Sequence, residues 1–536
     1  MKSTPSWLEK AVFYQIYPQT FYDANGDGIW DIPGIVQKLG YLRSLGVNAL
    51  WLNPCFESPF FDAGYDVSDY YKVAPRYGTN DDLQRLFVEA KRHYLRIFLD
   101  LVPGHTSIEN AWFKESCRHE PNEYSDWFIW TNSVWMPPLP GLQNVRGFAE
   151  RNGGFIVNFF YHQPALNFGF ANPDSSHPWQ QAVDAPGPQR VRQEIKNIMK
   201  FWLEMGADGF RVDMAGSLVK FDFSGKETAR FWQWIRQWLD AEYPEAAIVA
   251  EWSRPLVSIP GAFHMDFMLP FGARGYSSLF RKPYGRGPGA DPYSWSFFDR
   301  SGNGNIREFL DEYLPNHSGS KDEGFISLIS GNHDVYPRLS KGRNTDDLEL
   351  AFLFLLTMPG VPFIYYGDEI GMRDVEGLPS KEGGYERTMV RSPMQWDDSP
   401  NAGFSTATAE QLYLPIDPAP DRPTVAAQLA DPTSLLNRTR RLIALRQSHP
   451  ALCASGDFEV IFAEGGKVPF VYRRSTSDEN LLVAINPADR PGEVVLPAAL
   501  ISNPPTTLFG AKDAFRREGN KWTLRLPGVA GGVYRL

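Results

Sequence analysis

Short runs of apolar and β-branched residues recur along most of the chain, and segments with helical spacing separate them. Between the first two runs, Ile35, Leu39, Leu42 and Leu45 repeat as one face of a helix does. The same spacing predicts helices at 83–90, 192–204, 227–239, 305–314, 347–357 and 434–447. The strand-like runs are 11–18, 47–54, 95–103, 209–214, 246–252, 263–269, 324–334 and 361–369. Eight strands that alternate with helices predict a closed (β/α)₈ TIM barrel of the α/β class.

Two stretches depart from this alternation. The segment 105–190 is rich in Trp, Phe, Asn, Pro and Gly and is too long for an ordinary loop, so it predicts an inserted subdomain or a lid. After residue 451, the short alternating runs DFEVIF, PFVYRR, NLLVAIN, GEVVLP, WTLRL and GVYRL predict the strands of an antiparallel β-domain. The expected order is barrel (1–104), inserted subdomain after the third strand (105–175), barrel (176–450) and C-terminal β-sandwich (451–536).

The composition is that of a globular protein and argues against other classes. The 536 residues have a net charge of −10 and no dense run of Lys or Arg, so we expect no nucleic-acid partner. No stretch approaches the ~20 apolar residues that span a membrane, and the start lacks the apolar core of a signal peptide. Cys55, Cys117 and Cys453 match neither a disulfide framework nor a metal site. We expect a reduced, cytoplasmic enzyme without a membrane partner.

Charged side chains gather where the predicted strands end. In GFRVDMAG (209–216), Arg211 and Asp213 lie two residues apart, so a strand presents both on one face. A single carboxylate at a strand end is often a helix N-cap. However, several charges on one rim of a barrel are costly to bury unless they are paired or functional. The other polar residues at strand ends or in the loop after the second strand are Asp62, Tyr65, Asp66, Asp100, His105, Glu251, His333 and Asp334.

Carboxyl groups paired in a cleft are what glycoside hydrolysis requires. One carboxylic acid protonates the leaving oxygen, while another carboxylate attacks the anomeric carbon or activates water. Arg211 is expected to lower the pKa of Asp213 and so to favour its ionised form. A zinc-dependent hydrolase is the alternative, because His and Asp also ligate zinc, but the sequence contains no HxH or HExxH cluster.

Four motifs together resemble those of the α-amylase family, glycoside hydrolase family 13, in order and spacing. They are DLVPGH (100–105), GFRVDMAG (209–216), EW (251–252) and GNHD (331–334). The resemblance implies that Asp213 is the nucleophile, Glu251 the general acid/base and Asp334 the stabiliser of the transition state. It also implies retention of the anomeric configuration through a covalent glycosyl-enzyme.

Further motifs resemble one branch of that family, the oligo-1,6-glucosidases, trehalose synthases and sucrose-active enzymes. These motifs are DAGYD (62–66), QPALN (163–167) and RSPMQWDDSPNAGF (391–404). The resemblance implies that Asp62 pairs with Arg391 over the non-reducing end and that Tyr65 stacks on the sugar. The full set of residues implied to bind the substrate is Asp62, Tyr65, His105, Arg211, His333 and Arg391.

The segment DANGDGIWD (23–31) alternates acidic residues with glycines, as the start of an EF-hand does. Its twelfth position is Gly34, where an EF-hand needs a bidentate Glu, so it is not an EF-hand. An ordinary Asp-Gly turn is the alternative. The resemblance implies a structural Ca²⁺, and oxygen donors also suit Mg²⁺; no organic cofactor is expected. The implied ligands are Asp23, Asn25, Asp27, the carbonyl of Ile29, and Asp31.

Three positions depart from the family pattern without touching the three carboxylates. Gly104 stands where the first motif usually has Asn, which removes a hydrogen bond near His105. Ala165 stands where close relatives have Asp, and Met214 follows the nucleophile where they have Val, Ala or Thr. These departures affect the choice of substrate rather than the reaction.

The sequence therefore predicts a retaining α-glucosidase that acts on the non-reducing end of short α-glucosides. One alternative is a transferase or isomerase on the same scaffold, such as a trehalose synthase, a glucanotransferase or a sucrose-active enzyme. A second is a non-catalytic relative that binds carbohydrate or accompanies a transporter. Such a protein would be expected to lose the carboxylates and carry a membrane anchor, whereas this sequence keeps Asp213, Glu251 and Asp334 and shows no anchor.

Overall fold

The computed structural model describes residues 4–282, 295–519 and 521–536. Eight parallel strands form its central sheet in the order β11-β10-β9-β8-β5-β2-β1-β12, and a parallel bridge between Ile329 and Phe363 joins the two ends into a barrel. The closed (β/α)₈ fold predicted from the apolar runs is confirmed, and each run contains one strand. The strands are β1 (Phe13–Ile16), β2 (Ala49–Leu52), β5 (Arg96–Leu101), β8 (Gly209–Val212), β9 (Ala247–Ala250), β10 (Met265–Phe267), β11 (Phe325–Ser327) and β12 (Phe363–Tyr365).

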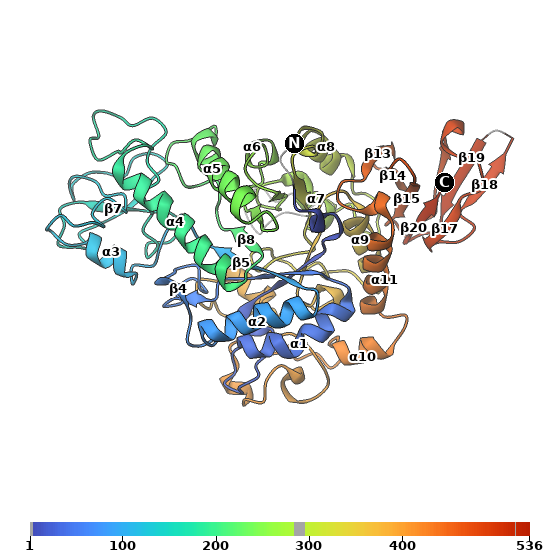
Figure 1. Ribbon diagram of the computed structural model, residues 1–536. Coiled ribbons are helices and arrows are strands. Elements are labelled where there is room, and N and C mark those ends of the chain that lie inside the picture. Colours follow the sequence, from blue (N-terminus) through green and yellow to red (C-terminus); the bar gives the residue numbers. More distant parts are fainter. Residues whose placement is uncertain (1–3, 283–294, 520) are drawn as a thin grey trace.

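Helices surround the strands, and local signals fix their ends (Figure 1). Thr79 and Asn344 begin two helices with capping boxes, and Gly46 ends the first α-helix in the left-handed conformation that suits glycine. All the helices predicted from spacing are present. The helices are α1 (Ile32–Leu45), α2 (Asn80–Arg92), α4 (Pro186–Met205), α5 (Lys226–Glu242), α6 (Pro255–Ser258), α7 (Arg274–Phe280), α8 (Arg307–Ser320), α9 (Thr345–Thr357), α10 (Val425–Ala430) and α11 (Leu435–Ser448).

A long segment between β5 and α4 forms the inserted subdomain. It projects from one side of the barrel (Figure 1) and contains α3 (Ala111–Ser116) and a hairpin of β6 (Gln143–Arg146) and β7 (Gly154–Val157). A small apolar cluster of its own, with Ile129, Ile156 and Phe170, holds it together. A shorter loop after β2 contains the antiparallel strand pair β3 (Phe56–Glu57) and β4 (Asp69–Val73).

The chain ends in two antiparallel sheets that face each other across an apolar core. Leu482 and Tyr534 of the five-stranded sheet pack in one cluster with Leu524 and Leu526 of the three-stranded sheet. The predicted C-terminal β-sandwich is confirmed, and the structure adds β17 and β18. The strands are β13 (Asp457–Phe462), β14 (Phe470–Ser475), β15 (Asn480–Asn486), β16 (Gly492–Leu496), β17 (Thr506–Gly510), β18 (Phe515–Glu518), β19 (Lys521–Leu526) and β20 (Ala530–Arg535).

Two buried arginines lie at the interface between the sandwich and the barrel, and one of them, Arg474, bonds across it. Arg446 of α11 donates to the carbonyl oxygens of Leu356, Met358 and Gly360. Arg474 of β14 donates to the carbonyls of Thr357, Cys453, Gly456 and Asp457. The helix α9, which is apolar on nearly all sides, is buried between the same two units. The interface between the barrel and the sandwich is therefore part of the protein interior.

Candidate active site

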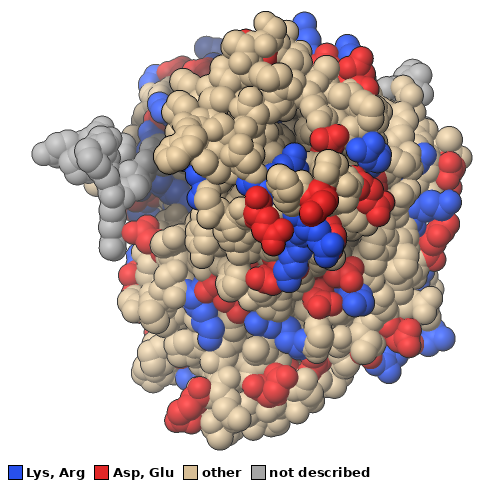
Figure 2. Space-filling view, turned by 90° about the vertical axis from the view of Figure 1, so that its left-hand side faces the viewer, with Lys and Arg blue, Asp and Glu red and all other residues tan. Residues whose placement is uncertain are grey.

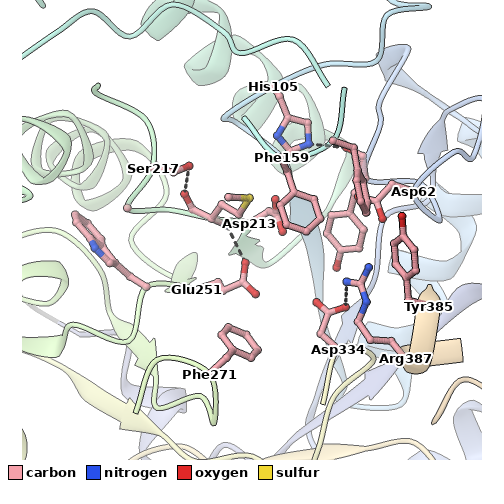
Figure 3. Close-up of a pocket in the computed structure, with 15 residues that line it drawn as sticks. Asp62, His105, Phe159, Asp213, Ser217, Glu251, Phe271, Asp334, Tyr385 and Arg387 are labelled. Carbon is pink, nitrogen blue, oxygen red and sulfur yellow. Dashed lines mark hydrogen bonds and ion pairs between the residues drawn. The ribbon is translucent and has the colours of Figure 1, made fainter. Parts of the chain in front are cut away.

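A pocket of about 730 Å³ opens at the carboxyl ends of the barrel strands, where the inserted subdomain covers one side. Figure 3 shows the side chains of Asp213, Glu251 and Asp334 turned toward this pocket, with the rings of Phe159 and Phe271 beside it. Active sites of TIM-barrel enzymes lie at this end of the barrel. The residues lining the pocket are Asp62, Tyr65, His105, Phe159, Phe160, Asp213, Met214, Gly216, Ser217, Glu251, Trp252, Phe271, Asp334, Tyr385 and Arg387.

The buried Arg211 side chain contacts three carboxylates, of which Asp213 and Glu251 line the pocket and Asp100 does not. Its Nη1 lies 2.8 Å from Asp100 Oδ1 and 2.8 Å from Asp213 Oδ1, and its Nη2 lies 2.7 Å from Glu251 Oε1. The guanidinium is buried, so no water screens these charges from one another. The predicted pairing of Arg211 with Asp213 is present, and the same cation also links the ends of β5 and β9 to β8.

The order of strands in the barrel sets this geometry. β8 pairs in parallel with β5 on one side and β9 on the other, which places Asp100 opposite Arg211. Directly after β8, Met214 adopts a left-handed backbone (φ 42°), which is uncommon for a side chain of its size. Its backbone N–H donates to Glu251 Oε2 at 2.9 Å. The strained turn therefore holds Glu251 beside Asp213.

The two carboxyl groups differ in proton affinity. Burial raises the pKa of Asp213 to about 7; Arg211 opposes this rise and Asp100 adds to it. Burial also raises the pKa of Glu251 to about 8, again against Arg211, and the negative charges of Asp213 and Asp334 raise it further. The expected lowering by Arg211 is present, but burial is the larger effect. Glu251 faces the negative charges of both Asp213 and Asp334, which favours Glu251 as the group that keeps its proton, the division that an acid and a nucleophile need.

Asp334 is surrounded by cationic and imidazole groups. Its Oδ1 accepts from Arg387 Nη1 at 2.7 Å and from Arg391 Nη2 at 3.0 Å, and its Oδ2 lies 3.1 Å from His333 Nε2. Burial alone would raise the pKa of Asp334, but His333, Arg387 and Arg391 together hold it below its ordinary value. Asp334 is therefore ionised at neutral pH.

A second layer of hydrogen bonds orients His333 and Tyr65. The Tyr65 hydroxyl donates to Asp100 Oδ2 at 3.0 Å and lies 2.8 Å from His333 Nε2, and the two rings stack at 5.3 Å. Gln15 and Asn53 meet the other ring nitrogen, His333 Nδ1, at 3.0 Å and 3.1 Å. Burial places the pKa of His333 well below its ordinary value, so the ring is neutral.

The residues implied to bind substrate divide into two groups. Asp62, Tyr65 and His105 line the pocket, whereas Arg211, His333 and Arg391 are almost fully buried and are not among its lining residues. The last three contact Asp213, Glu251 or Asp334, and the contact with a sugar that the resemblance implies for them stays a prediction.

One implied contact differs in the structure. Asp62 Oδ2 accepts from Gln163 Nε2 at 2.7 Å, while Arg391 pairs with Asp334. Asp62 and Arg391 therefore form no direct ion pair within the described ranges, and their implied role over the non-reducing end stays a prediction. Burial raises the pKa of Asp62 to about 6, and Gln163, Arg387 and Arg391 limit the rise. Of the two arginines, Arg387 lines the pocket, whereas Arg391 is buried behind it.

Several lining residues were not predicted from the sequence. Arg387 lies in a segment without regular spacing, and the aromatic side chains around the mouth come from separate loops. Phe159 and Phe160 belong to the inserted subdomain, with ring centroids 4.4 Å apart, and Tyr385 lies 6.1 Å from Phe160. Phe271 follows β10 and is 62% exposed at the pocket mouth. Only the local density of aromatic residues at 155–162 could have pointed to this rim.

The loop proposed as a calcium site contains suitable donors, but they are engaged. Asp23 Oδ1 and Oδ2 each accept a backbone N–H at 2.7 Å, from Gly26 and Gly28. Asp31 Oδ2 accepts from the N–H groups of Ala24 and Asn25, and its Oδ1 caps α1. Within the described ranges, no three Asp, Glu, His or Cys side chains are grouped as metal ligands. The oxygen atoms of this loop suit Ca²⁺. In this structure, however, the carboxylates of Asp23 and Asp31 accept hydrogen bonds from the backbone of their own loop.

A comparison with family models decides the classification. The model described as "Alpha amylase, catalytic domain" matches residues 15–455. The chain belongs to the alpha-amylase family. Membership covers the barrel, the inserted subdomain and the start of the sandwich, and the resemblance read from the four motifs is confirmed.

Curated relatives of this alpha-amylase family enzyme carry two kinds of name. It is 34% identical to a trehalose synthase/amylase from Mycolicibacterium smegmatis over 87% of this chain and 80% of that protein. It is 32% identical to an oligo-1,6-glucosidase from Heyndrickxia coagulans over 90% of this chain and 92% of the relative. Among solved structures, a trehalulose synthase variant superposes with a TM-score of 0.79 at 26% identity, covering 99% of this chain and all of that one. The chain is a glycoside hydrolase family enzyme whose relatives include both hydrolases and synthases.

Charged side chains of both signs lie on the surface. On the face shown in Figure 2, which carries the inserted subdomain, acidic and basic side chains are interspersed over the described part rather than separated by sign. None of the helices in the described ranges is both long and apolar enough to cross a membrane.

Proposed function

We propose that this protein is a retaining α-glucosidase acting on the non-reducing end of short α-linked gluco-oligosaccharides. The observation that carries the proposal is the meeting of Asp213, Glu251 and Asp334 at one pocket with three different proton affinities. Two adjacent carboxyl groups, one ionised and one protonated, are the requirement for a double-displacement glycosidase.

The reaction follows from those protonation states. Asp213 attacks the anomeric carbon as the glycosidic C–O bond breaks, and Glu251 gives its proton to the departing oxygen. A water molecule then attacks the same carbon, transfers a proton to Glu251 and releases Asp213. Asp334, which stays ionised beside Arg387 and Arg391, stabilises the positive charge that develops on the sugar ring.

An isomerase that moves a glucosyl unit from one position to another is the second candidate. It is supported by the relatives named trehalose synthase and by the aromatic rim, since Phe159 and Phe271 could retain a released sugar and limit the entry of water. The two candidates share the first chemical step and differ only in what attacks the glycosyl-enzyme.

Incubation with maltose, isomaltose, trehalose or sucrose is expected to yield mainly free monosaccharides. Water reaches the pocket through an open mouth, and it is the acceptor at highest concentration. Chromatographic analysis of the products over time measures this. An isomeric disaccharide that accumulates while little glucose appears would overturn the hydrolase proposal in favour of the isomerase.

We also propose that the loop at Asp23–Asp31 binds Ca²⁺, with Mg²⁺ as an alternative, through Asp23, Asn25, Asp27, the Ile29 carbonyl and Asp31. The all-oxygen donor set supports this, and the ion would stiffen the loop without taking part in the chemistry. Removal of divalent ions with EDTA is then expected to lower the melting temperature by several degrees, and Ca²⁺ should restore it. An Asp27→Ala variant should not respond. Equal melting temperatures with EDTA and with Ca²⁺ would contradict the site.

We propose a reducing, cytoplasmic location because the three cysteine thiols are free. Cys55, Cys117 and Cys453 are all unpaired, and Cys55 and Cys453 are buried. Such thiols persist where the environment keeps them reduced.

A further inference from the structure

Gly104 leaves a space beside the pocket that another part of the chain fills. A Cβ atom added to Gly104 would lie 2.6 Å from Asn158 Nδ2 and 3.5 Å from Ser217 Oγ. The first distance is far below van der Waals contact, so a side chain at 104 and the present position of Asn158 exclude each other. Asn158 follows β7 in the inserted subdomain, so the space is filled by a different structural unit.

The Asn158 amide bonds to several groups at the pocket wall. Its Nδ2 lies 3.2 Å from His105 Nδ1, 3.2 Å from Ser217 Oγ and 3.8 Å from Met214 Sδ. His105, Ser217 and Met214 all line the pocket. An amide at this point therefore contacts three parts of the wall at once, including the residue that follows Asp213.

A buried lysine determines which way this amide faces. Lys220 Nζ donates to Asn158 Oδ1 at 2.9 Å and to the Ser217 carbonyl at 2.9 Å. Lys220 is 7% exposed, no carboxylate in the described ranges pairs with it, and burial lowers its pKa to about 8, which leaves it charged at neutral pH. Because an ammonium group only donates, it requires the amide oxygen on its own side and turns the NH₂ group toward His105.

The orientation of the amide and the Tyr65 carbonyl together fix the tautomer of His105. Nδ1 faces an N–H donor and must accept, so the ring proton sits on Nε2, which lies 3.0 Å from the Tyr65 carbonyl oxygen. Burial lowers the pKa of His105 to about 3, with Lys220 adding to the effect, so the ring is neutral and has a single proton to place. Both nitrogens are then satisfied.

We propose that Asn158 and Lys220 are positioning residues: they fix the tautomer and orientation of His105 in the sugar-binding pocket. They thereby replace the Asn side chain that this sequence lacks at position 104. The inference rests on the proposed function, because its effect on turnover assumes that His105 contacts the glucosyl unit. It assigns a task to two residues of different structural units, the inserted subdomain and the loop after β8.

The first test replaces the amide by a carboxylate of the same shape. Asn158→Asp keeps the size and the contact with Lys220 but removes the donor to Nδ1, so kcat/KM for 4-nitrophenyl α-glucoside should fall about tenfold. The melting temperature should stay the same or rise, because Lys220 gains a partner. Asn152→Asp, at an exposed asparagine of the same subdomain, makes the same charge change as a matched control and should leave kcat/KM unaltered. Full activity of Asn158→Asp would overturn the proposal.

The second test moves the amide back to position 104. Asn158→Ala and Gly104→Asn should each lower kcat/KM about tenfold, the first by losing the donor and the second by crowding it. The double variant Gly104→Asn/Asn158→Ala should recover to within about threefold of wild type, since one amide again occupies the space. Losses that simply add in the double variant would contradict the exchange.

A spectroscopic measurement separates this inference from the proposed function. In protein labelled with ¹⁵N-histidine, the His105 signals, assigned by their loss in His105→Gln, should report an unprotonated Nδ1 in wild type and a protonated Nδ1 in Asn158→Asp. A wild-type enzyme inactive on every α-glucoside would defeat the proposed function, whereas the same tautomer in both proteins would defeat only the positioning role.

Discussion

Replacing Asp213 with Asn is expected to lower kcat for α-glucoside hydrolysis by about 10⁴-fold or more, because an amide cannot form the covalent glycosyl-enzyme. Arg211 still pairs with Asp100 and Glu251 in this variant, so the barrel should stay folded. Steady-state rates on maltose, together with circular dichroism, measure both expectations.

The control for this variant is Asp69→Asn, on β4 and outside the pocket lining, which should keep wild-type turnover. A 5-fluoro-α-glucosyl fluoride should also label wild-type protein on the peptide that carries Asp213. An Asp213→Asn enzyme with most of its activity, or a label on another carboxylate, would show that the nucleophile lies elsewhere.

Glu251→Gln is expected to lower kcat on maltose by about 10²- to 10⁴-fold, the range over which a general acid acts. The loss should be smaller for the bond-breaking step of 4-nitrophenyl α-glucoside, because its leaving group departs without a proton. In wild type, activity should rise as Asp213 loses its proton near its pKa of about 7 and fall as Glu251 loses its own near about 8. The alkaline fall should disappear in the variant.

Rescue by azide tests the general acid/base role assigned to Glu251. With Gln at 251, no base activates water, so azide should speed the breakdown of the glycosyl-enzyme and give an α-glucosyl azide. The α configuration follows from two successive inversions at the anomeric carbon. An alkaline fall that persists in Glu251→Gln, or a β-azide product, would contradict the roles assigned to Glu251 and Asp213.

The barrel could be predicted from the sequence because its strands are short, apolar and separated by helices of regular spacing. In the sandwich, β17 and β18 escaped prediction for a physical reason. β18 reads FRRE and is largely exposed, and β17 contains an irregular register between Thr507 and Phe509, so neither shows clean alternation. Exposed edge strands depend on their partners more than on their own sequence.

The three carboxylates at the pocket were predictable because barrel topology gathers all strand ends at one rim. Several of the side chains around them were not. Asn158 fills the space above Gly104 from 54 positions further along the chain, and Arg387 reaches Asp334 from a loop without regular spacing. The partner of Arg391 also differed from expectation, since Asp334 rather than Asp62 binds it. Such contacts depend on how loops fold over the rim, and loop sequences carry no periodic signal.

The buried interface at α9 makes the barrel and the sandwich one cooperative unit. Without the sandwich, the Thr357 carbonyl would lose the donor that Arg474 supplies, and apolar side chains of α9 would face water. The C-terminal sandwich is therefore no detachable accessory. Melting should show a single transition, and a protein engineer who wishes to exchange this sandwich would have to carry α9 and α11 along with it.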